Sequence, residues 1–414
     1  KFGPVAYLWI VLGCIFAGAT HDYLSGMLSM RNDGASLPEL IGKYLGRNAK
    51  MVMLAFTVLL LIMVGTVFVY SPAEILHSIW GSSLFWIIVI FAYYVIATML
   101  PIDKIIGKIY PLFAFSLLFM AGALMVMLFV KMPQLPELWT HFYNMGAEAE
   151  PEKWTDQIFP CLFITIACGA ISGFHATQSP LMARCVKSEH MGRPIFYGAM
   201  ITEGVVALIW ATVSSWFFYG SPAPGYELIA AVNTGFSTSA PAVVNIVCND
   251  WLGVAGAILA LLGVVAAPIT SGDTAFRSAR LIIGEWLHID QRPIIKRLAI
   301  CLPLFISSIA MLVWQIENPD GFNIIWQYFG WANQTLSVFT LWTLTVYLVR
   351  QKKPYIITLI PALLMTTVCT TFLFVSKQAF HLPENIGYLL GILCLVVALV
   401  WFIVWYRKEK SKLV

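Results

Sequence analysis

Of the 414 residues, 59% are hydrophobic and only 11% are charged, and the formal net charge is +4. Soluble domains carry about a quarter charged residues, so a soluble fold of this composition would expose apolar surface that polar groups could not cover. The composition therefore excludes a soluble globular protein and indicates a chain whose surface is covered by lipid.

The predicted elements are membrane-spanning helices, because about 20 consecutive apolar residues cross a bilayer core. Apolar runs that meet this requirement lie, in chain order, at 5–28, 50–71, 83–100, 109–131, 158–179, 196–218, 253–270, 297–315, 323–348, 354–375 and 386–406. Glycine, proline, serine and threonine interrupt 158–179 and 253–270, which are the least regular. The sequence thus predicts an all-α integral membrane protein with about eleven transmembrane helices.

Lysine and arginine are concentrated in alternate loops between these spans. Positively charged loops stay in the cytoplasm, so this pattern predicts a multi-pass protein with a cytoplasmic C-terminus. The first span then begins outside, and an earlier helix is expected upstream of Lys1.

The loops leave no room for a separate soluble domain. The longest external loops, 132–157 and 219–252, are too short to hold an independent core. We therefore expect residues 1–414 to form a single transmembrane domain. Within the second loop, 227–241 predicts a short helix on the outer surface.

The span at 158–179 changes character half way along. Its second half gives the candidate substrate-binding residues Cys168, Gly169, Ser172, Gly173, His175, Thr177 and Gln178. Glycine costs a helix about 1 kcal/mol relative to alanine, and unwound backbone is tolerated in a membrane only beside a cavity or inside protein. One interpretation is a broken helix whose free backbone groups bind a substrate or ion. The alternative is a close contact between two helices at Gly169 and Gly173.

The span at 253–270 runs on into a cluster of oxygen ligands. After Pro268, which removes a helical hydrogen bond, the candidate ion- or proton-coupling residues are Thr270, Ser271, Asp273 and Thr274. Hard oxygen groups suit a small cation or a proton. The alternative is the frayed cytoplasmic end of a helix, with Asp273 paired to Arg277 at i+4.

Three further ionisable residues lie inside predicted spans: His21, Asp22 and Glu203. Such groups are costly in a membrane unless paired or solvated, so they are candidates for ion or proton coupling. The alternative is a structural pair with an arginine at the cytoplasmic rim, Asp22 with Arg31 or Glu203 with Arg193.

Several enzyme signatures are missing from the sequence. It contains no P-loop, HExxH, GxSxG or CxxC motif, so we predict no catalytic residues, no metal ligands, no cofactor and no ATP-driven transport by this chain alone. The basic residues are spread over several loops rather than gathered with aromatic ones, which makes nucleic-acid binding improbable.

Three stretches of the chain resemble one family. AGATHDYLSGMLSMRNDGASLPELIGKYLG (17–46), ISGFHATQSPLMAR (171–184) and SGDTAFRSARLIIGEWLHID (271–290) are similar to the carbon starvation protein A (CstA) family of bacterial inner-membrane transporters. Members usually begin with one or two further helices, including a Gly-rich segment ahead of the position of Lys1.

The resemblance implies the LeuT-like inverted repeat of the amino acid–polyamine–organocation superfamily, with five plus five helices. Helices within 5–131 would form the first repeat without its first helix, those within 158–348 the second, and those within 354–406 two additional C-terminal helices. Span 158–179 would then be the discontinuous sixth helix. Span 253–270 would be the eighth, which presents hydroxyl oxygens to an ion in sodium-coupled relatives.

By the same resemblance, we expect a secondary transporter that imports pyruvate or peptides during carbon starvation by alternating access. Amides at the broken helix would meet the substrate carboxylate. Asp273 or Asp22 would carry the coupling ion, H⁺ or alternatively Na⁺. A transporter-like membrane sensor with a cytoplasmic signalling partner is the second hypothesis, and a membrane enzyme is the third. The sequence does not specify the oligomeric state.

Overall fold

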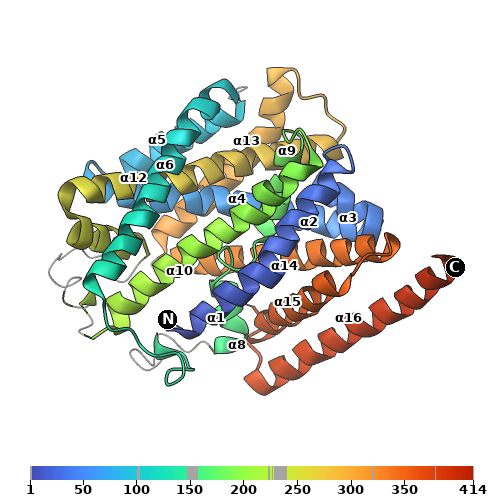
Figure 1. Cartoon of the computed structure of the whole chain (residues 1–414). Helices are drawn as coiled ribbons and strands as arrows, with labels where there is room; N and C mark the ends of the chain where they lie inside the picture. The colour runs from blue at the N-terminus through green and yellow to red at the C-terminus, as the bar shows by residue number, and fades with distance from the viewer. Residues whose placement is uncertain are drawn as a thin grey trace. The chain divides into compact units, whose positions relative to one another are not determined.

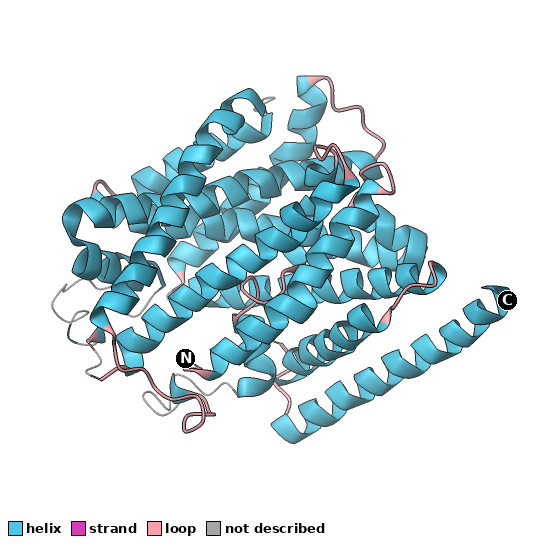
Figure 2. Ribbon diagram, in the orientation of Figure 1, coloured by secondary structure: helices cyan, strands magenta, loops and turns pink. Residues whose placement is uncertain are grey.

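The computed structural model describes residues 2–99, 103–146, 157–221, 224–225, 227, 240–318, 321–377 and 379–413. Figures 1 and 2 show that helices make up the regular structure of this part of the chain. An isolated bridge joins Gln134 and Ser221. The prediction of an all-α protein is confirmed. Most of the segment 227–241, for which the sequence predicts a surface helix, lies outside the described residues.

Eight helical segments among the described residues are long and apolar enough to cross a membrane. They are Val5–Met30, Arg47–His77, Pro111–Lys131, Glu189–Tyr219, Gly256–Trp286, Ile294–Glu317, Ile356–Val375 and Glu384–Ser411. Of the other predicted spans, α5 (Ser83–Met99) is shorter, α14 (Gly321–Arg350) carries polar amides, and 158–179 is interrupted. A multi-pass membrane protein is thus confirmed, and the number of about eleven spans stays a prediction.

The chain divides into two compact units, each assembled from separate stretches. The first comprises Lys1–Leu60, His141–Leu208 and Trp326–Val414, and the second comprises Leu61–Thr140 and Ile209–Ile325. Helices α4 (Arg47–Ile79), α10 (Gly198–Tyr219) and α14 contribute residues to both. The single transmembrane domain therefore stays a prediction.

In the first unit, the first span is a composite helix. It consists of α1 (Val5–Leu12), the π-helix η1 (Gly13–Gly18) and α2 (Ala19–Met30). A π-helical turn holds more residues than an α-helical one and is frequent at functional sites. It lets the chain pass very close to a second irregular segment, since a Cβ on Gly18 would collide with the backbone oxygen of Ala170.

Seven further helices of the described residues lie wholly within the first unit. They are α3 (Leu37–Leu45), α8 (Ile158–Thr165), α9 (Gly173–Ala183), η2 (Glu189–Met191), η3 (Arg193–Tyr197), α15 (Ile356–Val375) and α16 (Glu384–Leu413). Helix α2 lies along α9, and α15 lies along α16 (Figure 1). A buried apolar cluster joins α1, α8, α14 and α15 through Trp9, Leu162, Leu341 and Met365.

Helix α16 presents a broad apolar face away from the core. Leu389, Val397 and Trp401 are exposed on it. Such a face suits lipid, because a transmembrane helix satisfies its backbone hydrogen bonds internally and needs only apolar side chains outside.

The second unit is built on the long helix α12 (Ala240–Trp286), which packs along α6 (Asp103–Lys131) and contacts α5 and α13 (Ile294–Glu317). The Tyr94 hydroxyl lies within hydrogen-bonding distance of the carbonyl oxygens of Phe68 (2.7 Å) and Pro268 (3.2 Å). Helix α12 continues through Pro268 as far as Trp286. The alternative of a frayed helix end near Thr270 is therefore wrong, because the cluster lies about three to four turns before the helix ends.

Candidate functional site

The span at 158–179 is interrupted in the first unit. Helix α8 ends at Thr165 and α9 begins at Gly173, so the segment 166–172 between them is not helical. The predicted break is confirmed, but it lies earlier than expected, because residues from Gly173 to Gln178 form the first turns of α9.

The alternative interpretation, a close contact between helices at Gly169 and Gly173, also holds. A Cβ on Gly169 would approach the Ala207 Cβ of α10 to 2.5 Å. A Cβ on Gly173 would collide with the Asn333 carbonyl oxygen of α14 and approach the Ser337 nitrogen to 2.6 Å. The small residues therefore serve both the break and the close packing of the helices beside it.

Side chains from neighbouring helices hydrogen-bond to the backbone around the break. Trp9 Nε1 donates to the Ile166 carbonyl at 2.9 Å, and Gln334 Nε2 donates to the Phe163 carbonyl at 2.9 Å. The Phe174 amide donates to Asn333 Oδ1 at 2.6 Å. Buried backbone groups need such partners. One amide at the start of α9 is therefore already occupied, which reduces the number of amides that could meet a substrate carboxylate.

Asn333 of α14 is a buried polar residue that the sequence analysis missed. Its Oδ1 also accepts a hydrogen bond from Ser172 Oγ at 3.3 Å, and its Nδ2 lies 3.8 Å from Cys168 Sγ. Cys168 Sγ is 3.7 Å from Ser172 Oγ. The signal that could have found it is the pair of adjacent amides, Asn333 and Gln334, within an otherwise apolar span.

Four ionisable side chains form a continuous ladder next to the break. On α2, His21 Nδ1 lies 2.8 Å from Asp22 Oδ1. On α9, His175 Nδ1 lies 2.7 Å from Asp22 Oδ2, and its Nε2 lies 3.1 Å from Glu203 Oε2 of α10. We call His21, Asp22, His175 and Glu203 the carboxylate–imidazole ladder. Because its members come from α2, α9 and α10, it ties both irregular spans to a third helix.

Exposure increases steadily along the ladder. The exposed fraction of the side chain is 0% for His21 and 7% for Asp22, then 24% for His175 and 37% for Glu203. Ionised groups that are withdrawn from water need partners of opposite charge. The graded burial leaves Glu203 as the most accessible end of the ladder.

Hydroxyl groups fix α2 against α9 one turn from the ladder. Ser25 Oγ and Ser179 Oγ lie 3.2 Å apart. Ser25 also donates to the Asp22 carbonyl, and Ser179 to the His175 carbonyl. These contacts hold the Asp22–His175 pair in register.

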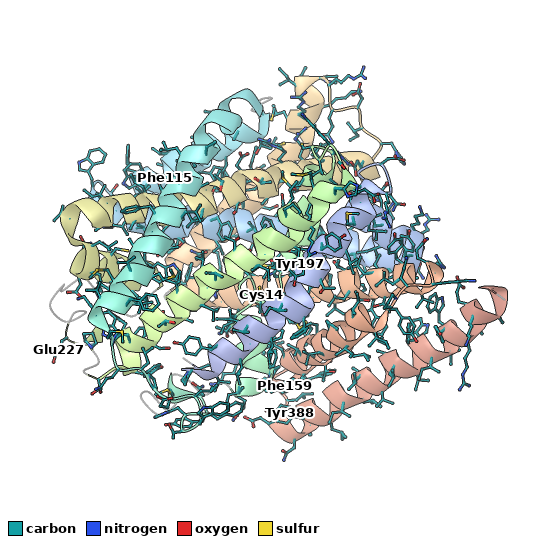
Figure 3. The ribbon with its side chains drawn as sticks, in the orientation of Figure 1. Cys14, Phe115, Phe159, Tyr197, Glu227 and Tyr388 are labelled. Carbon is teal, nitrogen blue, oxygen red and sulfur yellow. The ribbon has the colours of Figure 1, made fainter. Side chains whose placement is uncertain are left out.

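The π-helix contacts α10 beside Glu203. Cys14 Sγ donates to the Met200 carbonyl at 3.3 Å, and a Cβ on Gly204 would approach that sulfur to 2.5 Å. Cys14 packs in a small buried cluster whose border includes Tyr197, and both residues are labelled in Figure 3. The irregular turn therefore brings the first span directly against the helix that carries Glu203.

The expected pairs with arginine are not the ones found. Asp22 pairs with the two histidines rather than with Arg31, and Glu203 pairs with His175 rather than with Arg193. Arg31 instead forms a two-point ion pair with Glu189, at 3.0 and 2.9 Å. Together with the nearby Tyr347 hydroxyl, Glu189 raises the pKa of Arg31, so that the guanidinium stays charged.

Two other candidates on α9 make local contacts. Thr177 Oγ1 donates to the Phe174 carbonyl at 2.7 Å, and Gln178 Nε2 donates to Thr177 Oγ1 at 2.7 Å. The Thr177 hydroxyl hydrogen is thus used within its own helix. Their role in substrate binding stays a prediction.

The second predicted cluster lies on α12 in the other unit. Asp273 is fully buried and its Oδ1 lies 3.3 Å from Arg277 Nη2, which confirms the i+4 alternative. Thr270 donates to the Ala267 carbonyl, and Thr274 donates to the Thr270 carbonyl. Ser271 is half-buried on the same helix. The two threonine hydroxyl hydrogens and the carboxylate are therefore already paired locally, and ion coupling by this cluster stays a prediction.

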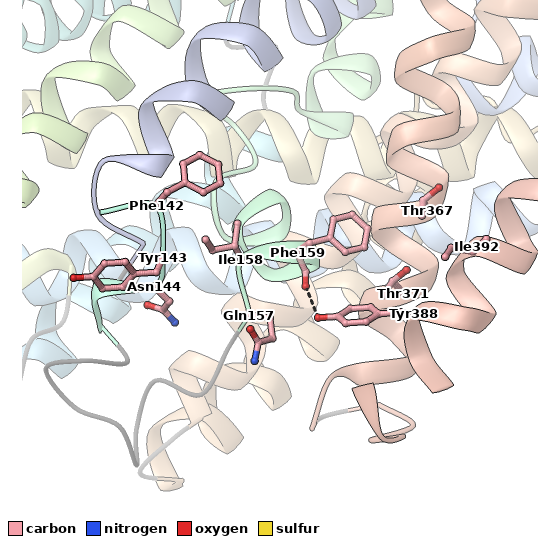
Figure 4. Close-up of a pocket in the computed structure, with 10 residues that line it drawn as sticks. All are labelled: Phe142, Tyr143, Asn144, Gln157, Ile158, Phe159, Thr367, Thr371, Tyr388 and Ile392. Carbon is pink, nitrogen blue, oxygen red and sulfur yellow. Dashed lines mark hydrogen bonds between the residues drawn. The ribbon is translucent and has the colours of Figure 1, made fainter. Parts of the chain in front are cut away.

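Two cavities lie at the N-terminal end of α8. The first, of about 560 Å³, is lined by uncharged side chains including Phe142, Gln157 and Tyr388, and Tyr388 donates to the Phe159 carbonyl at 3.1 Å (Figure 4). It offers no charge to an anion. The second, of about 450 Å³, has charged side chains in its lining and reaches Ile164 and Thr165, immediately before the break; its ionisable lining residues are Lys377, His381 and Glu384.

Within the described ranges, no group of three or more His, Cys, Asp or Glu side chains is arranged to hold a metal ion. The ladder is a chain of pairwise contacts in which imidazole nitrogens face carboxylate oxygens. Such an arrangement suits the binding and movement of protons.

Fold and site together define a multi-pass α-helical membrane protein with a broken helix beside buried ionisable groups. The family model described as carbon starvation protein CstA matches residues 2–87, 71–247 and 228–372. The chain belongs to this family, as the resemblance of its motifs implies.

Individual relatives agree with this assignment. The chain is 44% identical to a membrane protein of Haemophilus influenzae over 56% of this chain and 74% of that protein. It is 23% identical to the peptide transporter CstA of Escherichia coli, over 92% of this chain and 70% of the relative. It is 26% identical to the pyruvate/proton symporter BtsT of Escherichia coli over 49% of this chain and 36% of that protein.

The fold is similar to that of a solved transporter. A mutant of the manganese transporter of Eremococcus coleocola superposes with a TM-score of 0.57 at 13% sequence identity, over 97% of this chain and 89% of that chain. At this identity the likeness concerns the fold alone.

Proposed function

We propose that this chain is a secondary active transporter that imports small carboxylate-bearing nutrients, pyruvate or peptides, together with a proton. Membership of the CstA family and the likeness to a peptide transporter and a pyruvate/proton symporter support transport. The observation that carries the proposal is the carboxylate–imidazole ladder directly beside the helix break. Buried ionisable groups in a membrane protein mark ion and proton pathways.

We place the chain in the inner membrane of a bacterium with its C-terminus in the cytoplasm, because alternate loops are rich in Lys and Arg. We further propose about eleven spans in a LeuT-like five-plus-five repeat. Helices α8 and α9 would form the discontinuous sixth helix, and α12 would contain the eighth. The transporter-like fold of a distant relative supports this assignment.

In the proposed cycle, the segment between Thr165 and Gly173 is the hinge for alternating access. Broken helices in transporters bind substrate at the ends of their half-helices. The start of α9 carries partial positive charge, and the buried amide of Asn333 and hydroxyl of Ser172 lie beside it. Asn333 Nδ2 and the amides of α9 that are not already used would hold a carboxylate by hydrogen bonds, and the Ser172 hydroxyl would join them by turning away from Asn333 Oδ1. The charged cavity that reaches Ile164 would lead substrate towards the break.

Uptake of labelled pyruvate and labelled dipeptides into proteoliposomes tests this proposal. With an inward proton gradient, we expect one substrate class to accumulate above its external concentration, and a proton ionophore to abolish the accumulation. Accumulation that ignores the proton gradient but follows a sodium gradient would contradict proton coupling. Failure of every substrate to move, with capture of a cytoplasmic kinase, would favour the sensor instead.

A further inference from the structure

The two carboxylates of the ladder differ in their surroundings. Both oxygens of Asp22 face imidazole nitrogens, at 2.8 Å from His21 and 2.7 Å from His175, and its side chain is 7% exposed. Among the described residues, Glu203 has one ion-pair partner, His175, at its Oε2, and its side chain is 37% exposed. Asp22 is therefore fully paired and enclosed, whereas Glu203 is more exposed and its Oε1 has no partner among the described residues.

When both carboxylates are ionised, the geometry also sets the charge on the histidines. Both ring nitrogens of His175 face carboxylate oxygens, and an imidazole donates from both nitrogens only as the imidazolium. His21 donates to Asp22 through Nδ1, while its Nε2 is buried without a hydrogen-bond partner in the described part of the chain. A neutral His21 leaves a lone pair at that nitrogen rather than an unpaired N–H.

Charge counting then gives the ladder a net charge of minus one. Two carboxylates are balanced by one imidazolium, so a monoanionic substrate beside the break would bring a second uncompensated negative charge. Burying unpaired charge in a low-dielectric interior is strongly unfavourable. One additional proton on the ladder removes this penalty.

Resting on the proposed transport function, we propose that Glu203 takes up and releases the coupling proton, and that Asp22 is a positioning residue that holds His175. The sequence made Glu203 one of several candidates for ion or proton coupling and put Asp273 or Asp22 forward as the proton carrier. The assignment follows from the free Oε1 and the exposure of Glu203, and from the complete pairing of Asp22.

The proposed step is a single proton transfer. A proton from outside bonds to Glu203 Oε1, which converts the carboxylate to the neutral acid, while Oε2 continues to accept the His175 Nε2–H. The ladder becomes neutral, and one pyruvate monoanion with one proton crosses without net charge, whereas a zwitterionic dipeptide with one proton carries a net charge of plus one. On the cytoplasmic side the O–H bond breaks, the proton leaves to water, and the carboxylate is restored.

Other titratable groups face Glu203 and enter the account of pH dependence. These are His175 on α9, His21 and Asp22 on α2, Cys14 on η1 and Cys168 in the break. Among these groups, the carboxylates and imidazoles are the ones that form ion pairs with one another. The change of charge with pH therefore falls on the carboxylate–imidazole ladder.

The test compares Glu203→Gln with Asp22→Asn in proteoliposomes. Glutamine imitates the protonated acid, so Glu203→Gln should keep substrate exchange between equal pools but lose gradient-driven accumulation. With a gradient of about one pH unit, wild type can accumulate substrate up to about tenfold, and Glu203→Gln should stay near unity. Exchange by wild type should fall as the pH rises, whereas exchange by Glu203→Gln should not change. Asp22→Asn should lower the rate but leave the residual uptake proton-driven.

Controls separate the possible failures. Glu317→Gln, the same change at an exposed residue outside the ladder, should behave as wild type, and Glu203→Asp should restore partial coupling. Gradient-driven accumulation by Glu203→Gln, or uncoupled exchange by Asp22→Asn, would overturn the assignment. Absence of coupled transport in wild type would overturn the proposed function itself.

A second measurement applies if Glu203→Gln also loses exchange. Pyruvate or a dipeptide is added to the purified protein, and the number of protons that the protein takes up is measured. Proton uptake in wild type alone supports the assignment, and equal uptake by both proteins refutes it.

Discussion

Substitution of Gly173 by alanine examines how tightly the start of α9 is held against α14. The added Cβ would collide with the Asn333 carbonyl oxygen and would lie 2.6 Å from the Ser337 nitrogen and 2.7 Å from the Leu336 Cβ. Two of these three atoms belong to the backbone and cannot rotate away. The half-helix must therefore move, which strains the 2.6 Å hydrogen bond between the Phe174 amide and Asn333.

The expected loss follows from these two effects. Overpacking a well-packed site costs about 1–3 kcal/mol, and a weakened buried hydrogen bond costs about 0.5–1.5 kcal/mol. We therefore expect Gly173→Ala to lower the free energy of unfolding by about 2–4 kcal/mol.

Denaturant titration in mixed micelles would measure this loss. The matched control is Gly122→Ala on α6, where no atom lies within 4 Å of the added Cβ and the expected change is within about 0.5 kcal/mol. Equal unfolding of Gly173→Ala and wild type would refute the close approach of α9 and α14.

Three further variants test separate parts of the structure. Asn333→Ala should raise the substrate KM and lower unfolding free energy by about 1–3 kcal/mol, because the Phe174 amide loses its acceptor; an unchanged KM would separate Asn333 from the substrate site. Glu189→Gln should leave the midpoint of denaturant unfolding close to that of wild type, since its pair with Arg31 is half-exposed, and a large fall in the midpoint would contradict this. Asp273→Asn should destabilise the protein by about 3–5 kcal/mol, because the mostly buried Arg277 guanidinium loses its carboxylate partner, yet the accumulation ratio of labelled substrate should stay proton-driven; loss of coupling would restore Asp273 as a proton carrier.

Local sequence patterns predicted the features that depend on local chemistry. Apolar runs predicted the helical class, and the density of glycine and serine predicted the break near Gly169. The pair of Asp273 with Arg277 could also be anticipated, because i and i+4 residues share a helix face. The position of the break could not be anticipated, because a glycine can mark either unwound backbone or a close contact between helices. Gly173 is helical and belongs to the second kind.

The arrangement of the site depended on long-range contacts that one sequence does not contain. His21, Asp22 and Glu203 were identifiable as costly groups in a membrane, but the partner of Asp22 on α9 lies 153 positions away. The sequence favoured nearby arginines instead. The π-helix at Gly13–Gly18 gave no sequence signal, since its residues also suit an ordinary apolar helix. The one sequence signal for Asn333 is its neighbour Gln334, a second amide in an otherwise apolar span.

The most direct measurement is proton flux driven by substrate alone. Proteoliposomes loaded with a pH-sensitive dye start with equal pH on both sides, and pyruvate or a dipeptide is added outside. If the carboxylate–imidazole ladder couples substrate entry to proton entry, the lumen of liposomes with the wild-type protein acidifies. The lumen of liposomes with Glu203→Gln does not. Substrate entry without acidification in wild type, or the same acidification in both proteins, would contradict the mechanism.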